Sequence, residues 1–395
     1  MKIVEIIFWV SLGIVFYTYL GYGIILYILV RLKELFANSK EKSFDLMDLP
    51  PVTLLIAAYN EEDIVEEKMA NTAQLTYPAG KLNIIWITDG STDRTNERLA
   101  KYKDVEVLFE PKRAGKTAAL NRAIFFVKTP LVIFTDANTM LNNEAVIEIA
   151  KAFNDKKVGC VAGEKRIASK EKESASSGGE GIYWKYESFL KNLDSRLNSA
   201  VGAAGELFAV RTELFEPMEQ DTLLDDFILS MRIAAKGFKI SYCSTAYAVE
   251  EGTLNMQEER KRKIRISAGG LQSVYRLSPV ITVFKTPLLW FQYISHRVLR
   301  WTVTPLFLFA LLPLNVAIVI NGGAYLYIIA LSLQILFYIL AIIGVILEEK
   351  EIRNKVVFVP YYFLFMNYNV FNGALYLFRK KRGDGTWEKS KRQSR

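Results

Sequence analysis

A run of apolar residues near the start of the chain, Ile3 to Val30, restricts the fold more than any other feature of the sequence. At ~1.5 Å per helical residue, the run is long enough to cross a hydrocarbon core of ~30 Å. A secretory signal peptide would have a shorter apolar core followed by small residues, whereas this run continues into Arg31 and Lys33. We therefore predict a retained membrane helix over 1–31 and a linker over 32–50.

Two further apolar segments lie in the last hundred residues of the chain. The segment 301–347 is interrupted by Asn321, Gly322 and Gly323, which predicts a hairpin of two membrane helices joined by a tight turn. The segment 348–378 has two open interpretations, a further membrane crossing or a re-entrant segment packed within the bundle. It carries polar or helix-breaking residues that a lipid-facing helix avoids, namely Pro360, Asn367, Asn369 and Asn372.

The positive charge of the chain is concentrated beside the apolar segments. The formal net charge is +8, and the tail 379–395 holds eight Lys/Arg against two Asp/Glu, or +6. The positive-inside rule then predicts a multi-pass protein of the cell membrane with a cytoplasmic tail and a cytoplasmic central domain. With the N-terminus outside, two later crossings satisfy this arrangement and three do not. We expect these basic residues to contact the lipid bilayer, and we expect no nucleic-acid partner.

The segment 279–300 mixes aromatic and basic residues, which predicts an amphipathic helix lying in the headgroup region. Trp387 in the tail has two interpretations, an interfacial anchor, which we favour, or part of a loop that closes over a donor pocket.

Cys160 and Cys243 provide neither a disulfide framework nor a cysteine metal site, and core packing is favoured for both. The only histidine of the sequence, His296, argues against histidine-metal chemistry and against a Ser-His-Asp hydrolase.

The central segment, 51–278, alternates short apolar runs with helical stretches. Such alternation predicts an α/β domain with a doubly wound mixed sheet, which binds ligands at the carboxyl ends of its strands. Polar residues follow each apolar run; singly they are typical of turns and helix caps, but their clustering at one edge favours a ligand site. The four predicted strands are Val52–Ala58, Leu82–Thr88, Val105–Phe109 and Leu131–Thr135.

Two acidic motifs suggest the chemistry of that site. Asp136 and Asn138 could offer oxygen ligands to a hard cation that neutralises a nucleoside diphosphate, although an ordinary turn fits the same residues. Asp225 and Asp226 stand between apolar residues, where burial and mutual repulsion could adjust one carboxylate for proton transfer; a helix cap is the competing interpretation. Lys116 could add positive charge near phosphates.

These motifs, in this order over Pro51 to Gln272, resemble glycosyltransferase family 2, particularly its membrane-bound branch of cellulose, chitin, hyaluronan and poly-N-acetylglucosamine synthases. The resemblance implies a fold of the glycosyltransferase A type and a nucleotide-sugar donor. The segments that carry it are Ala58-Tyr-Asn-Glu-Glu62, Asp89-Gly-Ser-Thr-Asp93, Gly115-Lys116, Ala119-Leu-Asn121, Thr135-Asp-Ala-Asn138 and Asp225-Asp226.

Carried over by position, the resemblance implies that Asp89 contacts the nucleobase and that Asp136 and Asn138 hold Mg²⁺ or Mn²⁺ on the diphosphate. Asp226, beside Asp225, is implied to be the base that takes the acceptor's proton, with inversion to a β-linkage. Nucleotide contacts are further implied for Ala58, Tyr59, Glu61, Lys116 and Arg265.

Acceptor contacts are implied for Gly202, Gly205, Glu206, Arg262 and Ile266. The chain departs from the family at three motifs. Asn138 replaces the second Asp of DxD, and Leu224-Asp225 replaces the Thr-Glu of Thr-Glu-Asp; the third departure is in the QxxRW motif. In the QxxRW motif only Arg265 is retained, and Ile266 replaces the Trp that lines the acceptor end in processive synthases.

The leading hypothesis is therefore an inverting, metal-dependent hexosyl- or N-acetylhexosaminyltransferase that builds a β-linked polysaccharide from a UDP-sugar. A second hypothesis is single transfer to a polyprenyl-phosphate or other lipid acceptor, which the replacement at Ile266 brings forward. A third is a regulator that binds nucleotide or glycan without catalysis, against which the retained aspartates and Arg265 argue.

Overall fold

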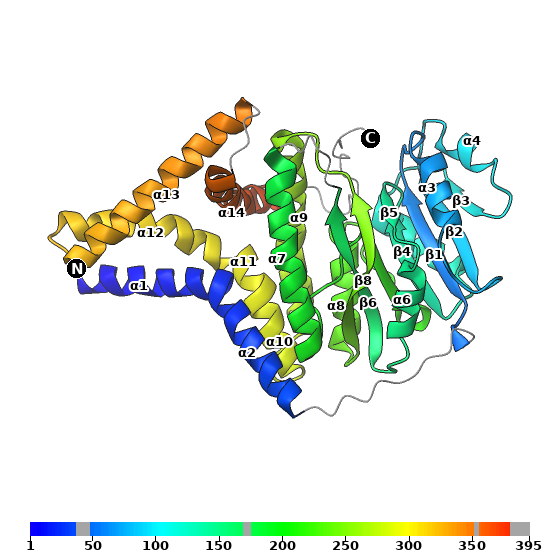
Figure 1. Ribbon diagram of the computed structural model, residues 1–395, viewed down its shortest axis with the longest axis horizontal. Coiled ribbons are helices and arrows are strands. Elements are labelled where there is room, and N and C mark those ends of the chain that lie inside the picture. Colours follow the sequence, from blue (N-terminus) through cyan, green and yellow to red (C-terminus); the bar gives the residue numbers. More distant parts are fainter. Residues whose placement is uncertain (37–47, 169–174, 351–354, 380–395) are drawn as a thin grey trace.

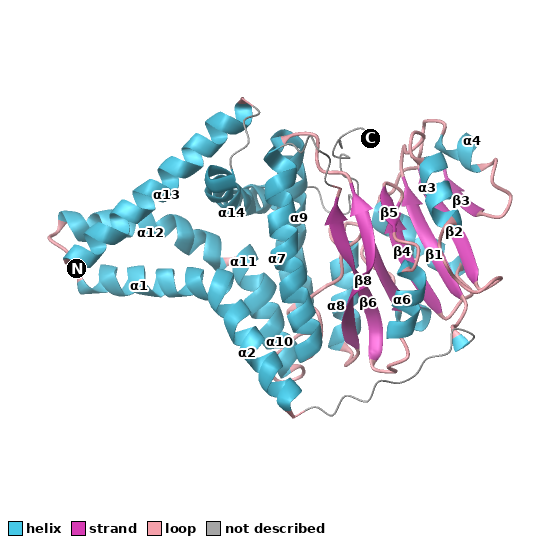
Figure 2. Ribbon diagram, viewed as in Figure 1, coloured by secondary structure: helices cyan, strands magenta, loops and turns pink. Residues whose placement is uncertain are grey.

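The computed structural model describes residues 1–36, 48–168, 175–350 and 355–379. A mixed sheet and its covering helices form one side of the molecule, and long helices form the other (Figure 2). Trp387 and the rest of the basic tail lie outside the described residues, so both interpretations of Trp387 remain predictions.

The sheet has eight strands in the order β3-β2-β1-β4-β7-β6-β8-β5. Strands β3, β2, β1 and β4 run parallel, β7 is antiparallel to both β4 and β6, and β5 is antiparallel to β8. The carboxyl ends of the four parallel strands therefore meet at one edge. The strands are β1 (Val52–Ala58), β2 (Leu82–Asp89), β3 (Glu106–Glu110), β4 (Leu131–Asp136), β5 (Thr139–Leu141), β6 (Val158–Ile167), β7 (Leu207–Arg211) and β8 (Lys239–Glu250).

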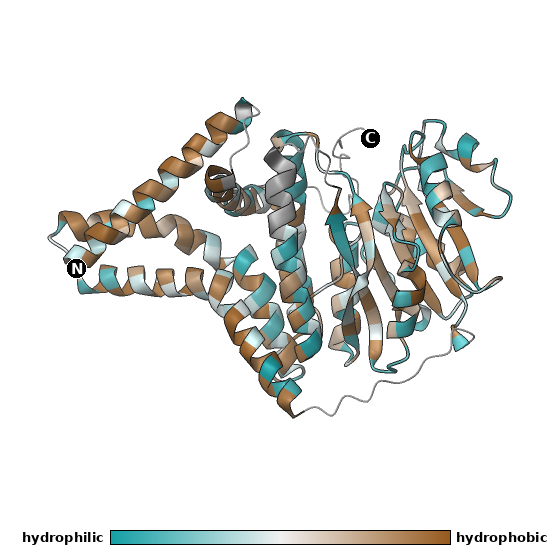
Figure 3. Ribbon diagram, viewed as in Figure 1, coloured by the Kyte–Doolittle hydropathy of each residue, from teal (hydrophilic) through white to brown (hydrophobic). Residues whose placement is uncertain are grey.

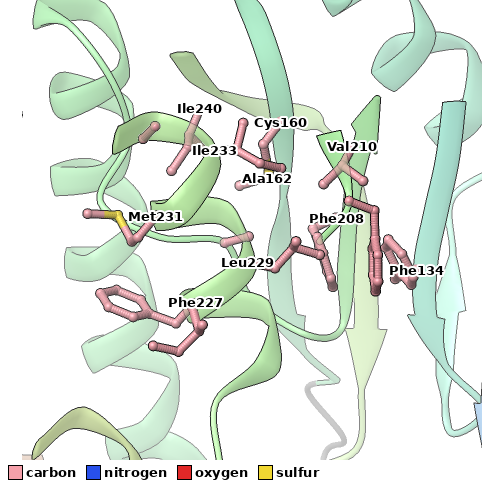
Figure 4. Packing of buried hydrophobic residues seen from close by; sticks show 14 of the residues in the cluster. Phe134, Cys160, Ala162, Phe208, Val210, Phe227, Leu229, Met231, Ile233 and Ile240 are labelled. Atoms are coloured by element: carbon pink, nitrogen blue, oxygen red, sulfur yellow. The ribbon is translucent and has the colours of Figure 1, made fainter. Parts of the chain in front are cut away.

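Helices cover both faces of the sheet, which explains why its central strands read as continuous apolar runs. Leu54 and Ile56 of β1 point into one core, against α3 and α6, and Leu55 points into the other, against α5 and α8. In the second core Phe134 and Phe208 stack with ring centroids 4.7 Å apart (Figure 4). The doubly wound mixed sheet is confirmed. Its short helices are α3 (Val65–Ala73), α4 (Thr95–Leu99), α5 (Lys116–Ala123), α6 (Ala145–Ala152), α8 (Asp225–Ala235) and the 3₁₀ turns Ile124–Phe126 and Thr212–Leu214.

Three of the described helices are long and apolar enough to cross a membrane: Lys2–Leu35, Val303–Ile320 and Tyr325–Glu348. They stand out as the apolar helices away from the sheet (Figure 3). The first bends at a π-helical turn and continues to Leu35, beyond the end predicted at residue 31. These helices are α1 (Lys2–Phe16), the π-helix η1 (Tyr17–Gly21), α2 (Tyr22–Leu35), α12 (Val303–Ile320) and α13 (Tyr325–Glu349).

Three more long helices, α7, α9 and α14, stand between the sheet and the membrane helices (Figure 1). Helix α14 packs directly on α9, because a Cβ at Gly373 would lie 2.7 Å from Ser267 Cβ. In α14, Asn367 and Asn369 are buried, and this helix is not among the three candidate membrane spans of the described chain. The bounds are α7 (Ala175–Leu197), α9 (Met256–Leu277) and α14 (Lys355–Arg379).

The segment 279–300 is more complex than one amphipathic helix. It becomes helical at Pro287 and contains a second π-helical turn, whose His296 is completely buried. Tyr17 of η1 and Ser295 join the two π-helical turns through hydroxyl groups 2.7 Å apart. The elements here are α10 (Pro287–Tyr293), η5 (Ile294–Val298) and α11 (Leu299–Trp301).

Candidate active site

The loops after β1 and β2 hold each other in place through hydrogen bonds. The backbone N–H of Asn60 donates to Ser91 Oγ (3.1 Å), and the N–H of Glu62 donates to Asp93 Oδ2 (3.0 Å). In return, the N–H of Thr92 donates to Asn60 Oδ1 (2.9 Å). The side chains of Ser91 and Asp93 therefore hold the two loops together. Asp89 is the carboxylate of this motif that lines the cavity at this edge of the sheet.

Asp89 lies at the end of β2 with one oxygen engaged. Its Oδ2 accepts hydrogen bonds from the N–H groups of Ala114 (2.9 Å) and Gly115 (2.6 Å). Its Oδ1 is buried and makes no hydrogen bond within the described chain, and Arg122 Nη1 is 4.0 Å away. A buried carboxylate oxygen without a donor is costly, so this atom is suited to accept a hydrogen bond from a ligand.

A cavity of about 230 Å³ opens at this edge of the sheet, and we call it the donor pocket. Arg113 covers the ring of Tyr59 at 3.8 Å and forms part of its wall. All the residues predicted for the nucleotide and the metal line this one cavity: Ala58, Tyr59, Glu61, Asp89, Lys116, Asp136, Asn138 and Arg265.

Two lysines flank the turn after β4. Lys116, the first residue of α5, places its Nζ 2.6 Å from Asp136 Oδ1. The buried Lys68 of α3 donates to the carbonyl of Thr139 (2.5 Å), and burial lowers the pKa of Lys68 to about 7 although Asp136 opposes the shift. For Lys116 burial also lowers the pKa, but the carboxylates of Asp136 and Asp225 outweigh it and raise the pKa above its usual value.

The protein ligands available to a cation are few. In the described parts of the chain, no three His, Cys, Asp or Glu side chains gather where they could hold a metal ion. Asp136 and Asn138 therefore offer one carboxylate and one amide oxygen at the pocket wall. Mg²⁺ is commonly bound by one or two carboxylates together with substrate phosphates and water, so these residues fit a cation that arrives with a diphosphate.

Asp225 and Asp226 begin helix α8. Burial, then the neighbouring Asp225, raise the pKa of Asp226 from 3.8 to about 7, against the opposing effect of Lys116. A carboxylate with a pKa near neutrality suits proton transfer at physiological pH. The helix-cap interpretation is wrong in detail, because the N-cap of α8 is Leu224 and no side chain makes a capping hydrogen bond there; Asp225 and Asp226 lie in the first turn, where negative charge suits the helix dipole.

A second cavity, of about 470 Å³, continues from these carboxylates toward the membrane helices, and we call it the chamber. Tyr19 and Leu20 of η1 and Phe363 and Met366 of α14 form its far wall. Asp226 lines the chamber and not the donor pocket. Residues common to both cavities include Lys116, Asp136, Asp225, Glu250, Arg262 and Arg265.

Four of the five predicted acceptor residues line the chamber: Gly205, Glu206, Arg262 and Ile266. Burial alone would raise the pKa of Glu206, but Lys165 (Nζ 2.5 Å from Oε1) and Arg262 (3.5 Å) hold it well below its usual range. A Cβ at Gly205 would lie 3.4 Å from Asp226 Oδ2, so the absence of a side chain keeps this carboxylate accessible.

Gly202 lies outside both cavities. Its φ is +82°, and a Cβ would lie 2.1 Å from Cδ2 of Phe227. The glycine therefore provides a left-handed turn and close packing behind the carboxylates. An acceptor contact for Gly202 stays a prediction.

The predictions from sequence missed much of the chamber wall. The helical spacing of Ile182, Tyr186, Phe189, Leu193 and Leu197 predicts a packing stripe. Tyr186 packs against α2 together with Leu193 and Leu197, and it also lines the chamber. The side chain of Ile182 lies outside the described residues. Lys191 projects from the side of α7 opposite this stripe, at about 100° per residue, so the stripe gave no signal for it. Wall residues without a predicted role in the site include Trp184, Lys191, Glu250, Arg297, Arg300 and the residues of α14.

Comparisons with known proteins identify relatives of the chain. The chain is 28% identical over 254 residues to the poly-beta-1,6-N-acetyl-D-glucosamine synthase of Staphylococcus aureus, covering 61% of this chain and 60% of the relative. It is 27% identical over 240 residues to a beta-monoglucosyldiacylglycerol synthase of a Nostoc species, covering 57% of this chain and 50% of that relative. The matches thus span about half to three fifths of these curated relatives.

Among solved structures, the mannosyltransferase PcManGT of Pyrobaculum calidifontis, in complex with GDP-Man and Mn²⁺, superposes with a TM-score of 0.72. The sequences are 19% identical, and the superposition covers 94% of this chain and 99% of that one. The likeness confirms the glycosyltransferase A-type fold. The family model described as "Glycosyltransferase like family 2" matches residues 50–269, more than half of the chain. The chain, whose described residues include three candidate membrane helices, therefore belongs to glycosyltransferase-like family 2.

Proposed function

We propose that this protein transfers a hexosyl or N-acetylhexosaminyl group, with inversion, from a nucleotide sugar to an acceptor that enters from the membrane side. The observation that carries the proposal is the junction of the two cavities. Asp136, Asp225 and Arg265 line both of them, while Asp89 lines the donor pocket alone and Asp226 lines the chamber alone. A donor and an acceptor bound in these cavities would meet at the carboxylates.

The donor pocket supports binding of a nucleoside diphosphate. Asp89 would accept a hydrogen bond from the nucleobase through its unengaged Oδ1. Lys116 and Arg265 would neutralise the diphosphate, and Arg265 has a buried Nε without a hydrogen-bond partner in the described chain. We favour UDP as the carrier by analogy with the family. Asp136 and Asn138 would hold Mg²⁺ or Mn²⁺, which supplies positive charge to the departing diphosphate.

Asp226 would act as the general base. The acceptor hydroxyl gives its proton to the Asp226 carboxylate while its oxygen forms a bond to the anomeric carbon. The bond between that carbon and the diphosphate oxygen breaks, and its electron pair leaves with the nucleoside diphosphate. An α-linked donor then gives a β-linked product. Positioning of the two substrates at the junction of the cavities accounts for much of the rate enhancement.

Two kinds of product follow from the proposal. A polysaccharide would require the product to re-enter the chamber as acceptor, whereas a lipid acceptor would receive one or a few sugars. The apolar far wall and Ile266 support an acceptor anchored in the bilayer. Among the relatives, one is named for a polymer and another for a glucosyl lipid, so each product has a precedent by name.

We also propose that the sheet domain faces the cytoplasm. Three crossings with the N-terminus outside place the central domain and the tail on the same side, in agreement with the positive charge of the tail and with Arg31 and Lys33 after the first helix.

A panel of nucleotide sugars tests the proposal. Purified protein in nanodiscs should release nucleoside diphosphate from at least one donor, and the release should cease on chelation and in Asp226→Asn. Mass analysis of the product then identifies sugar, acceptor and chain length. Release that survives both chelation and Asp226→Asn would contradict the roles assigned to the cation and to the base.

A further inference from the structure

A cluster of cations lies on the membrane side of the chamber, away from the donor pocket. Lys191 of α7, Arg297 of η5 and Arg300 of α11 all line the chamber, and none of them lines the donor pocket. Tyr19 of η1 and Phe363 of α14 lie on the same wall, with ring centroids 4.7 Å apart. The positive charge therefore adjoins aromatic and apolar surface contributed by the first candidate membrane span and by α14.

Lys191 is 4% exposed and makes no hydrogen bond or ion pair with the described residues. The carboxylates of Glu187, Asp226 and Glu206 attract it only from beyond ion-pair distance. Burial and the nearby Arg297 lower the pKa of Lys191 to about 8. Burial of most of this side chain disfavours its charged form, so packing alone does not explain a lysine at this position.

The neighbouring carboxylate cannot balance this charge. Glu187 contacts both Arg297 (2.8 Å) and Arg300, so that one negative charge serves two guanidinium groups. The other buried carboxylate of α7, Asp194, is engaged by Tyr22, Gln292 and His296. Arg297 keeps a buried Nε without a hydrogen-bond partner among the described residues. Lys191 and Arg297 thus keep hydrogen-bond donors that no described residue satisfies.

We propose that Lys191 and Arg297 bind the phosphate of a membrane lipid that carries the acceptor, with the lipid chain lying toward Leu20 and Phe363. The inference rests on the proposed function, because it assigns the acceptor class of the same chamber. A phosphate suits this site because it accepts charge-assisted hydrogen bonds from an ammonium and a guanidinium together. The lipid is the favoured source of the phosphate because the cluster lies outside the donor pocket and beside apolar helices.

The test uses two lipids that differ only in the phosphate, undecaprenyl phosphate and undecaprenol, with the full chain in nanodiscs. Native mass spectrometry should show that the wild type retains the phosphate lipid about tenfold better than the alcohol, since a hydrogen bond to a charged group has roughly this effect. Lys191→Met should lose this preference and Lys191→Arg should keep it. Lys185→Met, at an exposed lysine of the same helix, is the matched control and should behave as the wild type.

Equal retention of the two lipids by the wild type, or an undiminished preference in Lys191→Met, would overturn the inference. So would a loss of nucleoside diphosphate affinity in Lys191→Met, because the anion would then be the donor. Lys191→Gln replaces Lys191→Met if the latter does not fold.

The outcome is separable from that of the proposed function. Nucleoside diphosphate release by the wild type without a phosphate preference would leave the proposed function standing and remove the lipid site. Phosphate-dependent lipid binding without cleavage of any nucleotide sugar would support the lipid site and contradict the proposed function.

Discussion

Lys116 Nζ lies 2.6 Å from Asp136 Oδ1, so an ammonium group occupies one oxygen of the carboxylate assigned to the cation. The same Nζ is 3.8 Å from Asp225 Oδ2. Lys116 is therefore a common partner of the proposed cation site and of the acidic pair that contains the proposed base. A divalent cation at Asp136 would be repelled by this ammonium until a diphosphate is bound between them.

Lys116→Met should change the metal dependence of the reaction in a definite direction. Without the ammonium, Asp136 attracts a cation more strongly, so half-maximal activity should require less Mn²⁺. At the same time, kcat/KM for the donor should fall by about 10- to 100-fold, because a charged hydrogen-bond donor to the diphosphate is lost. Mn²⁺ titrations of nucleoside diphosphate release measure both effects.

Lys112→Met is the control for this variant, because Lys112 is an exposed lysine just upstream of the same helix. An unchanged Mn²⁺ requirement in Lys116→Met would separate Lys116 from the cation site.

The pH dependence of the reaction should report Asp226. A base must be unprotonated, so with a pKa of about 7 the value of kcat/KM should rise with pH up to about 7 and then level off. Asp225→Asn removes a negative charge that raises this pKa, so the rising limb should move to lower pH. Lys116→Met removes a charge that lowers it, so the limb should move to higher pH. Shifts in the same direction for both variants would contradict the assignment.

Asp226→Asn should abolish transfer and yet stabilise the protein above neutral pH. The folded state raises the pKa of Asp226 from 3.8 to about 7, so it binds this proton more tightly than the unfolded chain. The contribution of this group to stability is therefore fully present below pH ~4 and is lost as the pH rises to ~7. Asparagine carries no such charge, so the Tm gain of the variant should be larger at pH 8 than at pH 5.

Thermal unfolding at the two pH values measures this difference. Asp63→Asn, at an exposed carboxylate, is the matched control and should not show the gain. An equal change of Tm at both pH values in Asp226→Asn would mean that the folded protein does not perturb this group.

The sheet and the donor pocket could be predicted from the sequence because their signals are local. The parallel strands β1, β2 and β4 are mainly apolar runs, and a polar motif follows each of the parallel strands, so Asp89, Lys116 and Asp136 converge once the strands are aligned. The different roles of the two aspartates in the Asp89-Gly-Ser-Thr-Asp93 motif could not be predicted. Asp89 faces the cavity and Asp93 ties two loops together, a difference set by hydrogen bonds between segments about thirty residues apart.

The chamber could not be predicted because its wall comes from segments distant in the sequence. Tyr19 donates a hydrogen bond to Asn367 across 348 positions, and His296 contacts Asp194 across 102. Apolar periodicity in α7 reports that a face is buried but does not tell packing from cavity wall. For the same reason, the aromatic and basic mixture of 279–300 gave no sign that His296 would be completely buried.

Gly202→Ala should destabilise the protein and also impair transfer. The backbone there has φ +82°, which costs an alanine about 1–2 kcal/mol. The added Cβ would also lie 2.1 Å from Phe227, and overpacking of this kind costs about 1–3 kcal/mol more. Because Phe227 follows Asp226 in α8, its displacement would move the proposed base, so kcat should fall as well.

Gly80→Ala separates the two effects of that substitution. Gly80 has φ +73°, but a Cβ there would meet nothing within 4 Å. Chemical denaturation should therefore show a loss of about 1–2 kcal/mol in Gly80→Ala, from the backbone alone, and a larger loss in Gly202→Ala. The activity of folded Gly80→Ala should match that of the wild type. If both variants lost the same stability and kept full kcat, the contact between Gly202 and Phe227 would have no part in positioning Asp226.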